Sequence, residues 1–262
     1  MAIGPLIGVV LFGVFGMRGT ALTFLPTAGI ALWLLSQRRR YAVARPTRAP
    51  GETIVHASVP LLPMAAVIAV MMSRTWTIFS IEAFIPTWYA SLGYSASFYG
   101  PLTTVIVLAS AFGTLGSGSL ADRYGRRAVI LVSLVLTIPA VLLFAQFVGS
   151  VAFLTGTLLG LLAASSGPLT LIMAQQLMAG RAGMASGLIL GLGFVTGAIG
   201  VPITGAVADS YGMQTAMRLQ AVIVLLTLAV AWFLPTERTL DKLESSARTA
   251  TERRPARAEA GG

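Results

Sequence analysis

The stretch Gly118-Ser-Leu-Ala-Asp-Arg-Tyr-Gly-Arg-Arg127 carries three arginines and lies between two long apolar segments. Residues 101–119 contain hydroxyl groups but no charged side chain, and residues 128–148 form a run of 21 residues without a charge. Because about 20 apolar residues in a helix cross the roughly 30 Å of hydrocarbon in a bilayer, each segment is long enough to span a membrane. This cationic stretch therefore predicts a charged turn between two transmembrane helices.

The composition of the whole 262-residue chain agrees with a membrane protein. Hydrophobic residues make up 56% of the sequence and charged residues only 10%, whereas soluble globular domains carry about 25% charged residues. The chain has no cysteine, which excludes a disulfide framework, a cysteine-based metal site and a thiolate nucleophile. The net charge of +9 does not indicate nucleic-acid binding, because the basic residues gather in the connections between apolar segments.

Eight apolar segments predict an all-α polytopic membrane protein. The first segment has only 15 residues, which is short for a full crossing. No basic residue precedes it, so it is not interpreted as a secretory signal. The segments cover residues 2–16, 20–36, 60–88, 101–119, 128–148, 152–178, 184–207 and 213–234.

The positions of the 18 lysines and arginines predict the orientation of these segments. Fifteen of them fall on one side of an eight-span arrangement, only Arg18 and Arg218 fall on the other, and Arg74 lies within a segment. By the positive-inside rule, the richer side is the cytoplasm, both termini are cytoplasmic and the uncharged connection 89–100 is external. We therefore expect a multi-pass protein of the inner (plasma) membrane. The fifteen are Arg38, Arg39, Arg40, Arg45, Arg48, Arg123, Arg126, Arg127, Arg181, Arg238, Lys242, Arg248, Arg253, Arg254 and Arg257.

Changes in charge and hydropathy divide the chain into four parts. Residues 1–36 hold two apolar segments, and residues 37–57 form a basic linker with no apolar run. Residues 58–236 hold the remaining six segments, and residues 237–262 form a charged tail. We expect the linker and the tail to be cytoplasmic.

An internal repeat indicates a duplicated architecture. Gly205, Asp209 and Gly212 repeat the spacing of Gly118, Asp122 and Gly125 at an offset of 87 residues, since 205 − 118 and 209 − 122 both equal 87. Each copy follows an apolar segment, as expected for nested three-helix repeats in transporters. The second copy lacks the arginines, as an external connection should.

The cationic stretch resembles the signature Gly-x-Leu-Ala-Asp-Arg-x-Gly-Arg-Arg/Lys of the major facilitator superfamily of transporters. In that family the loop acts as a latch of the cytoplasmic gate, so the resemblance implies a gating role here. The arginines also fit a simpler role as topology charges or contacts to anionic lipids. The matching residues are Gly118, Leu120, Ala121, Asp122, Arg123, Gly125, Arg126 and Arg127.

Further resemblances place the chain within the twelve-helix fold of that superfamily. Gly4-Pro5 and Phe15-Gly-Met-Arg18 look like the end of its fifth helix and the start of its sixth. The resemblance therefore implies the six-helix C-terminal bundle plus two helices of an incomplete N-terminal bundle. Residues 84–88, 174–176 and 183–188 are similar to drug efflux proteins of the fosmidomycin-resistance type.

Two charged residues inside the segment 60–88 are candidates for the transport site. Arg74 lies near its middle, where a cation costs about 2.5 kcal/mol or more unless it meets water or a counter-ion. It could bind anionic groups of a substrate, or it could be a packing residue that meets carbonyls or phosphates. Glu82 follows about 12 Å along the helix and about 80° around it, so direct pairing with Arg74 is not expected. Its carboxyl could exchange protons, or it could be a solvated interfacial acid.

Three neutral side chains complete the candidate site. Trp76 offers aromatic surface for a drug-like ligand, and Gln175 and Gln176 offer amides at the end of the segment 152–178. The alternative for the two glutamines is a helix end that enters the cytoplasmic headgroups.

The resemblance implies transport of a small molecule, most simply proton-coupled efflux of a drug-like or anionic solute by alternating access. The partners expected are the lipid bilayer, the substrate and protons. The alternative is a truncated or half-transporter protein with no independent transport activity, which would need a partner subunit. An enzyme is not expected, because the one histidine, His56, lies in the linker and no nucleophile–base pair is visible. No cofactor is expected either.

Overall fold

The computed structural model describes residues 24–37, 60–178, 181–237 and 239–240. Contacts divide the chain into a first unit, residues 1–56, and a second unit, residues 57–262. In the first unit, the described helix is α2, Phe24–Ser36, within the predicted segment 20–36. The predicted segment 2–16, the Gly4-Pro5 resemblance and most of the linker lie outside the described residues.

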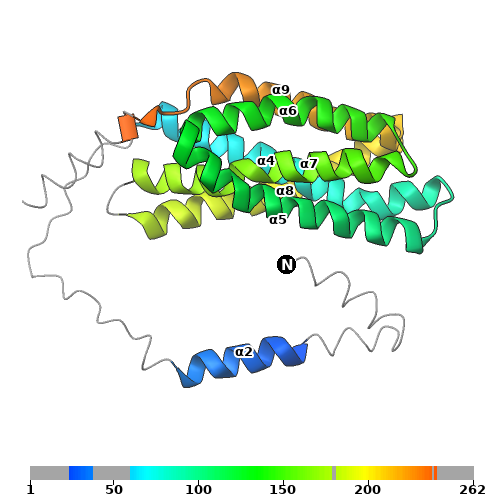
Figure 1. Cartoon of the computed structure of the whole chain (residues 1–262), viewed down its shortest axis with the longest axis horizontal. Helices are drawn as coiled ribbons and strands as arrows, with labels where there is room; N and C mark the ends of the chain where they lie inside the picture. The colour runs from blue at the N-terminus through cyan, green and yellow to red at the C-terminus, as the bar shows by residue number, and fades with distance from the viewer. Residues whose placement is uncertain (1–23, 38–59, 179–180, 238, 241–262) are drawn as a thin grey trace, which may run out of the picture. The chain divides into compact units, whose positions relative to one another are not determined.

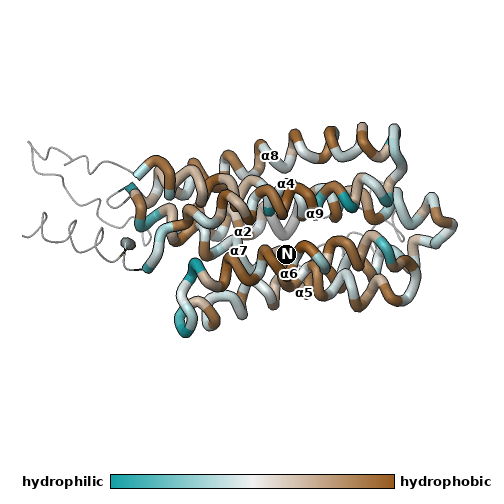
Figure 2. Tube along the Cα trace, turned by 90° about the horizontal axis from the view of Figure 1, so that it is seen from above, coloured by the Kyte–Doolittle hydropathy of each residue, from teal (hydrophilic) through white to brown (hydrophobic). Residues whose placement is uncertain are grey.

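The described part of the second unit contains six long helices joined by short connections (Figure 1). All six are long and apolar enough to cross a membrane. Figure 2 shows apolar residues along the lengths of the helices. The prediction of an all-α polytopic membrane protein is confirmed. The helices are α4 (Leu61–Ser91), α5 (Ala96–Tyr124), α6 (Arg126–Gln146), α7 (Val151–Leu177), α8 (Ala182–Tyr211) and α9 (Met213–Ala231).

The cationic stretch is mostly helix, which corrects the predicted extent of the turn. Helix α5 runs through Tyr124 and α6 begins at Arg126, so the turn is the single residue Gly125. Gly125 has φ 86° and ψ 145°, a backbone conformation that side chains with a Cβ rarely adopt. Its N–H donates to the carbonyl of Ala121 at 2.8 Å, which closes the last turn of α5.

The six helices form two three-helix sets that pack symmetrically. The first set is α4, α5 and α6, and the second is α7, α8 and α9. Helix α5 of the first set packs along α7 of the second, and α8 of the second packs along α4 of the first. In the same way α6 contacts α7 and α9 contacts α4, while the pairs α4–α7 and α6–α9 contact each other. Exchanging the two sets therefore leaves the pattern of contacts unchanged, as expected for a duplicated unit.

The two copies of the repeated sequence share one backbone geometry. Gly212 has φ 85° and ψ 153°, close to the values of Gly125. The Gly212 N–H donates to the carbonyl of Ala208 at 2.9 Å, as the Gly125 N–H does to Ala121. Each glycine thus ends the middle helix of its set and starts the last one.

Glycines let the helices of the two sets approach closely. A Cβ at Gly160 of α7 would lie 2.5 Å from the carbonyl oxygen of Ile106 in α5, and a Cβ at Gly200 of α8 would lie 2.5 Å from Cγ of Trp76 in α4. Glycines also recur along α8 at positions 183, 187, 191, 193 and 197. Gly193 lies against Met71 and Thr75, and Gly197 against Phe79. Gly183, Gly187 and Gly191 meet no atom within 4 Å.

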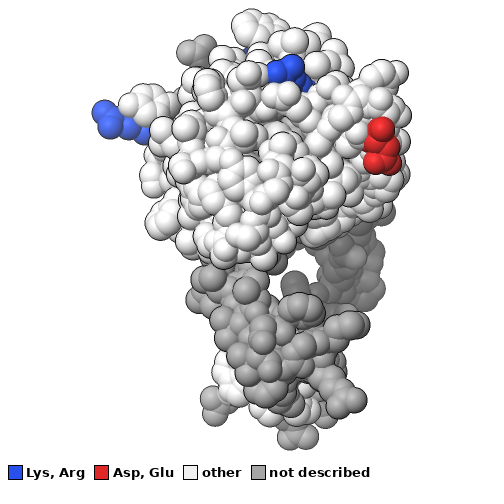
Figure 3. Space-filling view, turned by 90° about the vertical axis from the view of Figure 1, so that its right-hand side faces the viewer, with Lys and Arg blue, Asp and Glu red and all other residues white. Residues whose placement is uncertain are grey.

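The basic connections lie at one end of the bundle. In Figure 1 the α5–α6 and α7–α8 connections lie on the left. Arg123, Arg126 and Arg127 flank the first of these connections, and Arg181 lies in the second. The connections 92–95 and 147–150 lie at the opposite end. Figure 3 views the bundle from that second end, and charged side chains are sparse there.

Candidate functional site

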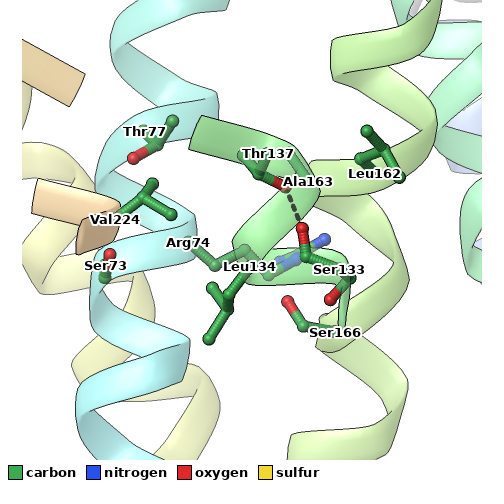
Figure 4. A pocket seen from close by; sticks show the side chains of 10 residues that line it. All are labelled: Ser73, Arg74, Thr77, Ser133, Leu134, Thr137, Leu162, Ala163, Ser166 and Val224. Carbon is green, nitrogen blue, oxygen red and sulfur yellow. Dashed lines mark hydrogen bonds between the residues drawn. The ribbon is translucent and has the colours of Figure 1, made fainter. Parts of the chain in front are cut away.

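Arg74 extends from α4 into a small pocket inside the six-helix bundle (Figure 4). The pocket has a volume of about 10 Å³, enough for about one water molecule. Its other lining residues are apolar or carry hydroxyl groups and come from α4, α6, α7 and α9. This Arg74 pocket is lined by Ser73, Arg74, Thr77, Ser133, Leu134, Thr137, Leu162, Ala163, Ser166 and Val224.

Gly167 of α7 makes room for the Arg74 guanidinium. A Cβ at Gly167 would lie 2.8 Å from Cζ of Arg74 and 3.0 Å from its Nε and Nη2. Real Cβ atoms do not approach other heavy atoms this closely. The guanidinium therefore lies directly over the backbone of α7, in a position that depends on the missing side chain of Gly167.

Three buried polar atoms of residues that line the Arg74 pocket have no hydrogen-bond partner. They are Nε of Arg74 and the hydroxyl oxygens of Ser73 and Thr77. On the α6 side, by contrast, the hydroxyls donate to helix carbonyls: Ser133 to Ile130 at 2.8 Å and Thr137 to Ser133 at 2.6 Å. Figure 4 draws Ser73 and Thr77 beside Val224, whereas the guanidinium reaches towards Ser133 and Ser166, on the side of α6 and α7.

Glu82 lies on the same helix as Arg74 but does not form an ion pair with it. Its side chain is half-buried, and the two groups do not approach within the 4.0 Å of an ion pair. They attract each other only over a longer distance. The structure therefore separates these two candidate residues, as the sequence spacing predicted.

Trp76 belongs to a polar network that joins α4, α8 and α9. Its indole N–H donates to the hydroxyl of Thr204 at 3.1 Å, and the Gln220 side-chain amide donates to the same oxygen at 3.1 Å. A hydroxyl has two acceptor lone pairs and one donor. Both lone pairs are used, so Thr204 donates to Ser80, 3.0 Å away.

This network holds the ring of Trp76 against Gly200, so the indole packs α4 against α8. Thr204 and Gln220 are fully buried and were missed by the sequence analysis. An amide within an apolar segment was the available signal for Gln220. Trp88, in the same helix, is buried against Tyr89 and Phe144.

Gln175 and Gln176 lie near the basic end of the bundle, and both are half-buried. The Gln175 amide donates to the hydroxyl of Ser186 at 2.8 Å, which joins α7 to α8. The Gln176 side-chain oxygen accepts from Nη1 of Arg126 at 2.5 Å. Neither glutamine lines the Arg74 pocket, and Gln176 belongs to the network of the cationic stretch.

Glu237 binds the start of α6. The backbone N–H of Arg126 donates to Oε1 of Glu237 at 2.6 Å, and its guanidinium lies 3.5 Å from Oε2. A carboxylate is stabilised at a helix N-terminus, where N–H groups are unpaired and the helix dipole is positive. Asp122 is exposed, and with Glu237 and Arg126 it lines a groove of about 330 Å³.

The other residues of the cationic stretch lie around this groove. Arg127 donates to the carbonyl of Trp232 at 2.7 Å and its guanidinium lies 5.9 Å from the centre of that indole ring. The guanidinium of Arg123 lies 5.4 Å from the ring centre of Tyr124. Gly118 has no neighbour within 4 Å of its missing Cβ, and Leu120 is half exposed.

The second copy of the repeat lies at the opposite end of the bundle. Asp209 is exposed there, and Gly205 faces Phe84, whose Cζ would lie 3.1 Å from an added Cβ. Within the described residues, no group of three His, Cys, Asp or Glu side chains could hold a metal ion.

Comparisons with known proteins place this bundle among transporters. The chain is 37% identical over 162 residues to the uncharacterized MFS-type transporter YfnC of Bacillus subtilis, a match that covers 61% of this chain and 39% of YfnC. It is 26% identical over 248 residues to the fosmidomycin resistance protein of Escherichia coli, covering 92% of this chain and 60% of that protein. The chain thus spans only part of the length of both relatives.

A solved structure shares the fold. The inward-open xylose transporter XylE of E. coli superimposes with a TM-score of 0.53 at 14% identity, covering 77% of this chain and 56% of XylE. Residues 64–259 match the Major Facilitator Superfamily. The expected resemblance is confirmed: this multi-pass membrane protein belongs to the Major Facilitator Superfamily.

Proposed function

We propose that this chain takes part in proton-coupled efflux of a drug-like or anionic solute by alternating access. Membership of a transporter superfamily supports transport, and the similarity to a protein named for fosmidomycin resistance supports efflux of a drug-like solute. The membrane is the inner (plasma) membrane, with the basic end of the bundle in the cytoplasm, because positive charge collects on the cytoplasmic side.

The observation that carries the proposal is the placement of Arg74. Its guanidinium occupies a pocket of hydroxyl and apolar side chains within a helix long enough to span the membrane, in a space that Gly167 leaves open. A cation kept at such a position is expected to have a function, because its burial is costly. Arg74 attracts the negative group of the solute.

Glu82 carries the coupling proton. It is a half-buried carboxyl in the same spanning helix, closer to the external end than Arg74. Proton binding at Glu82 changes the charge that Arg74 experiences, which links protonation to solute affinity. Trp76, Gln175 and Gln176 act less directly, since their hydrogen bonds hold helices together.

The cationic stretch and Glu237 form the cytoplasmic gate of the bundle. Arg126 links α6 to Gln176 of α7 and to Glu237 beyond α9. Gly125 provides the sharp turn, and Asp122 faces the groove where a partner helix would dock. In the second copy, Gly205, Asp209 and Gly212 repeat the turn at the other end without the arginines.

We further propose the four-part organisation that charge and hydropathy predicted: two helices in 1–36, a cytoplasmic linker 37–57, the bundle 58–236 and a cytoplasmic tail 237–262. The contacts of Glu237 and the full burial of Leu240 indicate that the tail begins by packing against the bundle.

The test is export from an efflux-deficient bacterium that expresses the full chain. Glu82→Gln and Arg74→Ala are expected to abolish pH-gradient-driven export of an anionic drug at unchanged membrane abundance. The matched controls are Asp209→Asn and Arg218→Ala. These variants change charged groups at the end of the bundle opposite the cationic stretch.

Full export by both site variants would overturn the roles of Arg74 and Glu82. No export by the unmodified chain would overturn independent transport. It would favour the alternative of a half-transporter that needs a partner subunit.

A further inference from the structure

We propose that Arg127 and Trp232 bind the headgroup of an anionic phospholipid, such as phosphatidylglycerol, whose acyl chains lie along α6 and α9. This inference goes beyond transport, because it concerns the surface of the bundle and not the Arg74 pocket. The start of α6 lies beside the end of α9 here, since Arg127 donates to the carbonyl of Trp232. The free charge of Arg127, the exposed indole of Trp232 and the apolar surface beside them support this assignment.

The positive charge of Arg127 has no counter-charge among the described residues. Glu237, at the start of α6, pairs with Arg126 instead. Within the Arg127 guanidinium, Nη2 donates to the Trp232 carbonyl and Nε is buried without an acceptor. Nη1 is neither hydrogen-bonded nor buried, so it can donate to a ligand outside the protein. A phosphate oxygen would accept this N–H in a charge-assisted hydrogen bond.

Trp232 places this charge at the level of lipid headgroups. Its side chain is 69% exposed, and its ring centre lies 5.9 Å from Cζ of Arg127. Tryptophan is enriched where a membrane meets water, with its ring at the depth of the headgroups. The carbonyl and the indole face of Trp232 therefore hold the guanidinium at the depth where lipid phosphates lie.

Helices α6 and α9 present an apolar surface next to this pair. The two helices contact each other and run side by side along the top of Figure 1. Exposed aliphatic side chains on both helices continue away from the arginine-rich end. The acyl chains of a lipid bound at Arg127 would therefore meet apolar surface on both helices. These side chains are Val132, Val135 and Leu136 of α6 and Leu225, Leu226 and Val230 of α9.

The charges around the turn favour an anionic over a zwitterionic lipid. Arg123 is exposed and, like Arg127, has no ion pair among the described residues. With Arg126 and Glu237 paired, the described charges left beside the turn are two arginines and Asp122, a net charge of +1. This charge repels the ammonium of a zwitterionic headgroup, whereas a glycerol headgroup carries only the negative phosphate.

Quenching of Trp232 fluorescence by spin-labelled lipids tests this proposal. The purified full chain is placed in phosphatidylcholine vesicles that contain a small fraction of a nitroxide-labelled lipid, either phosphatidylglycerol or phosphatidylcholine. The Trp232 signal is the difference between the unmodified chain and Trp232→Phe, because the chain has four tryptophans. We expect the phosphatidylglycerol probe to bind about fivefold more strongly, since one arginine near the membrane surface contributes about 1 kcal/mol.

Three variants locate the preference. Arg127→Gln should remove most of it, whereas Arg127→Lys should retain it because the charge remains. Arg218→Gln, at an arginine bonded to Gln146 at the other end of the bundle, should behave as the unmodified chain does.

Equal quenching by the two probes in the unmodified chain would overturn the proposal, and this comparison is decisive even if Arg127→Gln does not fold. A preference that survives in Arg127→Gln would overturn the site. Loss of the preference in inorganic phosphate, but not in sodium chloride of equal ionic strength, would identify free phosphate as the ligand and overturn the lipid.

Discussion

At the scale of single residues, Gly167 determines where the charge of Arg74 lies. An alanine Cβ at position 167 would meet the far end of a flexible side chain, at 2.8 Å from Cζ. The guanidinium can move away at little cost, so Gly167→Ala should fold with an unfolding temperature close to that of the unmodified chain. Export should nevertheless fall about tenfold or more, because a misplaced catalytic or binding group can cost up to about 100-fold.

The control for Gly167→Ala is Gly116→Ala, where an added Cβ meets nothing within 4 Å. Thermal unfolding in detergent and export assays on the same membranes measure both properties. Equal export by the two variants would contradict a role for the position of the guanidinium.

Single residues also show what the sequence could and could not predict. Arg74 and Glu82 were recognisable because a charge inside an apolar segment is rare and visible in one chain. Glu237 was assigned to the tail, since nothing in its local sequence indicates that the start of α6 lies beside it. The partners of Trp76 were missed for the same reason, as Thr204 lies 128 residues away.

At the scale of helices, α5 and α7 depend on a glycine contact. A Cβ at Gly160 would lie 2.5 Å from the backbone oxygen of Ile106, which cannot rotate away. Gly160→Ala should force α5 and α7 apart and lower the free energy of unfolding by about 1–3 kcal/mol, the usual cost of overpacking. Denaturation in mixed detergent micelles measures this change.

Gly191→Ala in α8 is the matched control, because its Cβ meets nothing within 4 Å. We expect little change in its stability. A stability of Gly160→Ala equal to that of Gly191→Ala would contradict close packing of α5 on α7.

Helices were the most predictable level of this structure. Apolar length alone located all six helices of the bundle, because the bilayer requires about 20 apolar residues per crossing. Apolar length did not predict the C-terminal end of α5, because the polar residues of the cationic stretch continue the helix to Tyr124. Charge indicates where a helix leaves the hydrocarbon, whereas a glycine with positive φ indicates where the helix ends. Glycine spacing along α8 likewise did not reveal which glycines face α4.

At the scale of the whole molecule, the distribution of arginines predicts the orientation in the membrane. Four arginines lie in or beside the connections at one end of the bundle, whereas the connections 92–95 and 147–150 at the other end have no basic residue. The four are Arg123, Arg126, Arg127 and Arg181. The positive-inside rule therefore predicts that the arginine-rich end is cytoplasmic. Because the chain has no cysteine, single cysteines can be labelled without background.

Ser97, in the first turn of α5, and Met184, in the first turn of α8, are exposed at opposite ends of the bundle. In intact bacterial cells, a membrane-impermeant maleimide should label Ser97→Cys but not Met184→Cys. Met184→Cys should react only after the inner membrane is permeabilised, at a rate similar to that of Ser97→Cys. The opposite order would reverse the orientation. It would then place the Arg126–Glu237 contact on the external side, where it could not act as a cytoplasmic gate.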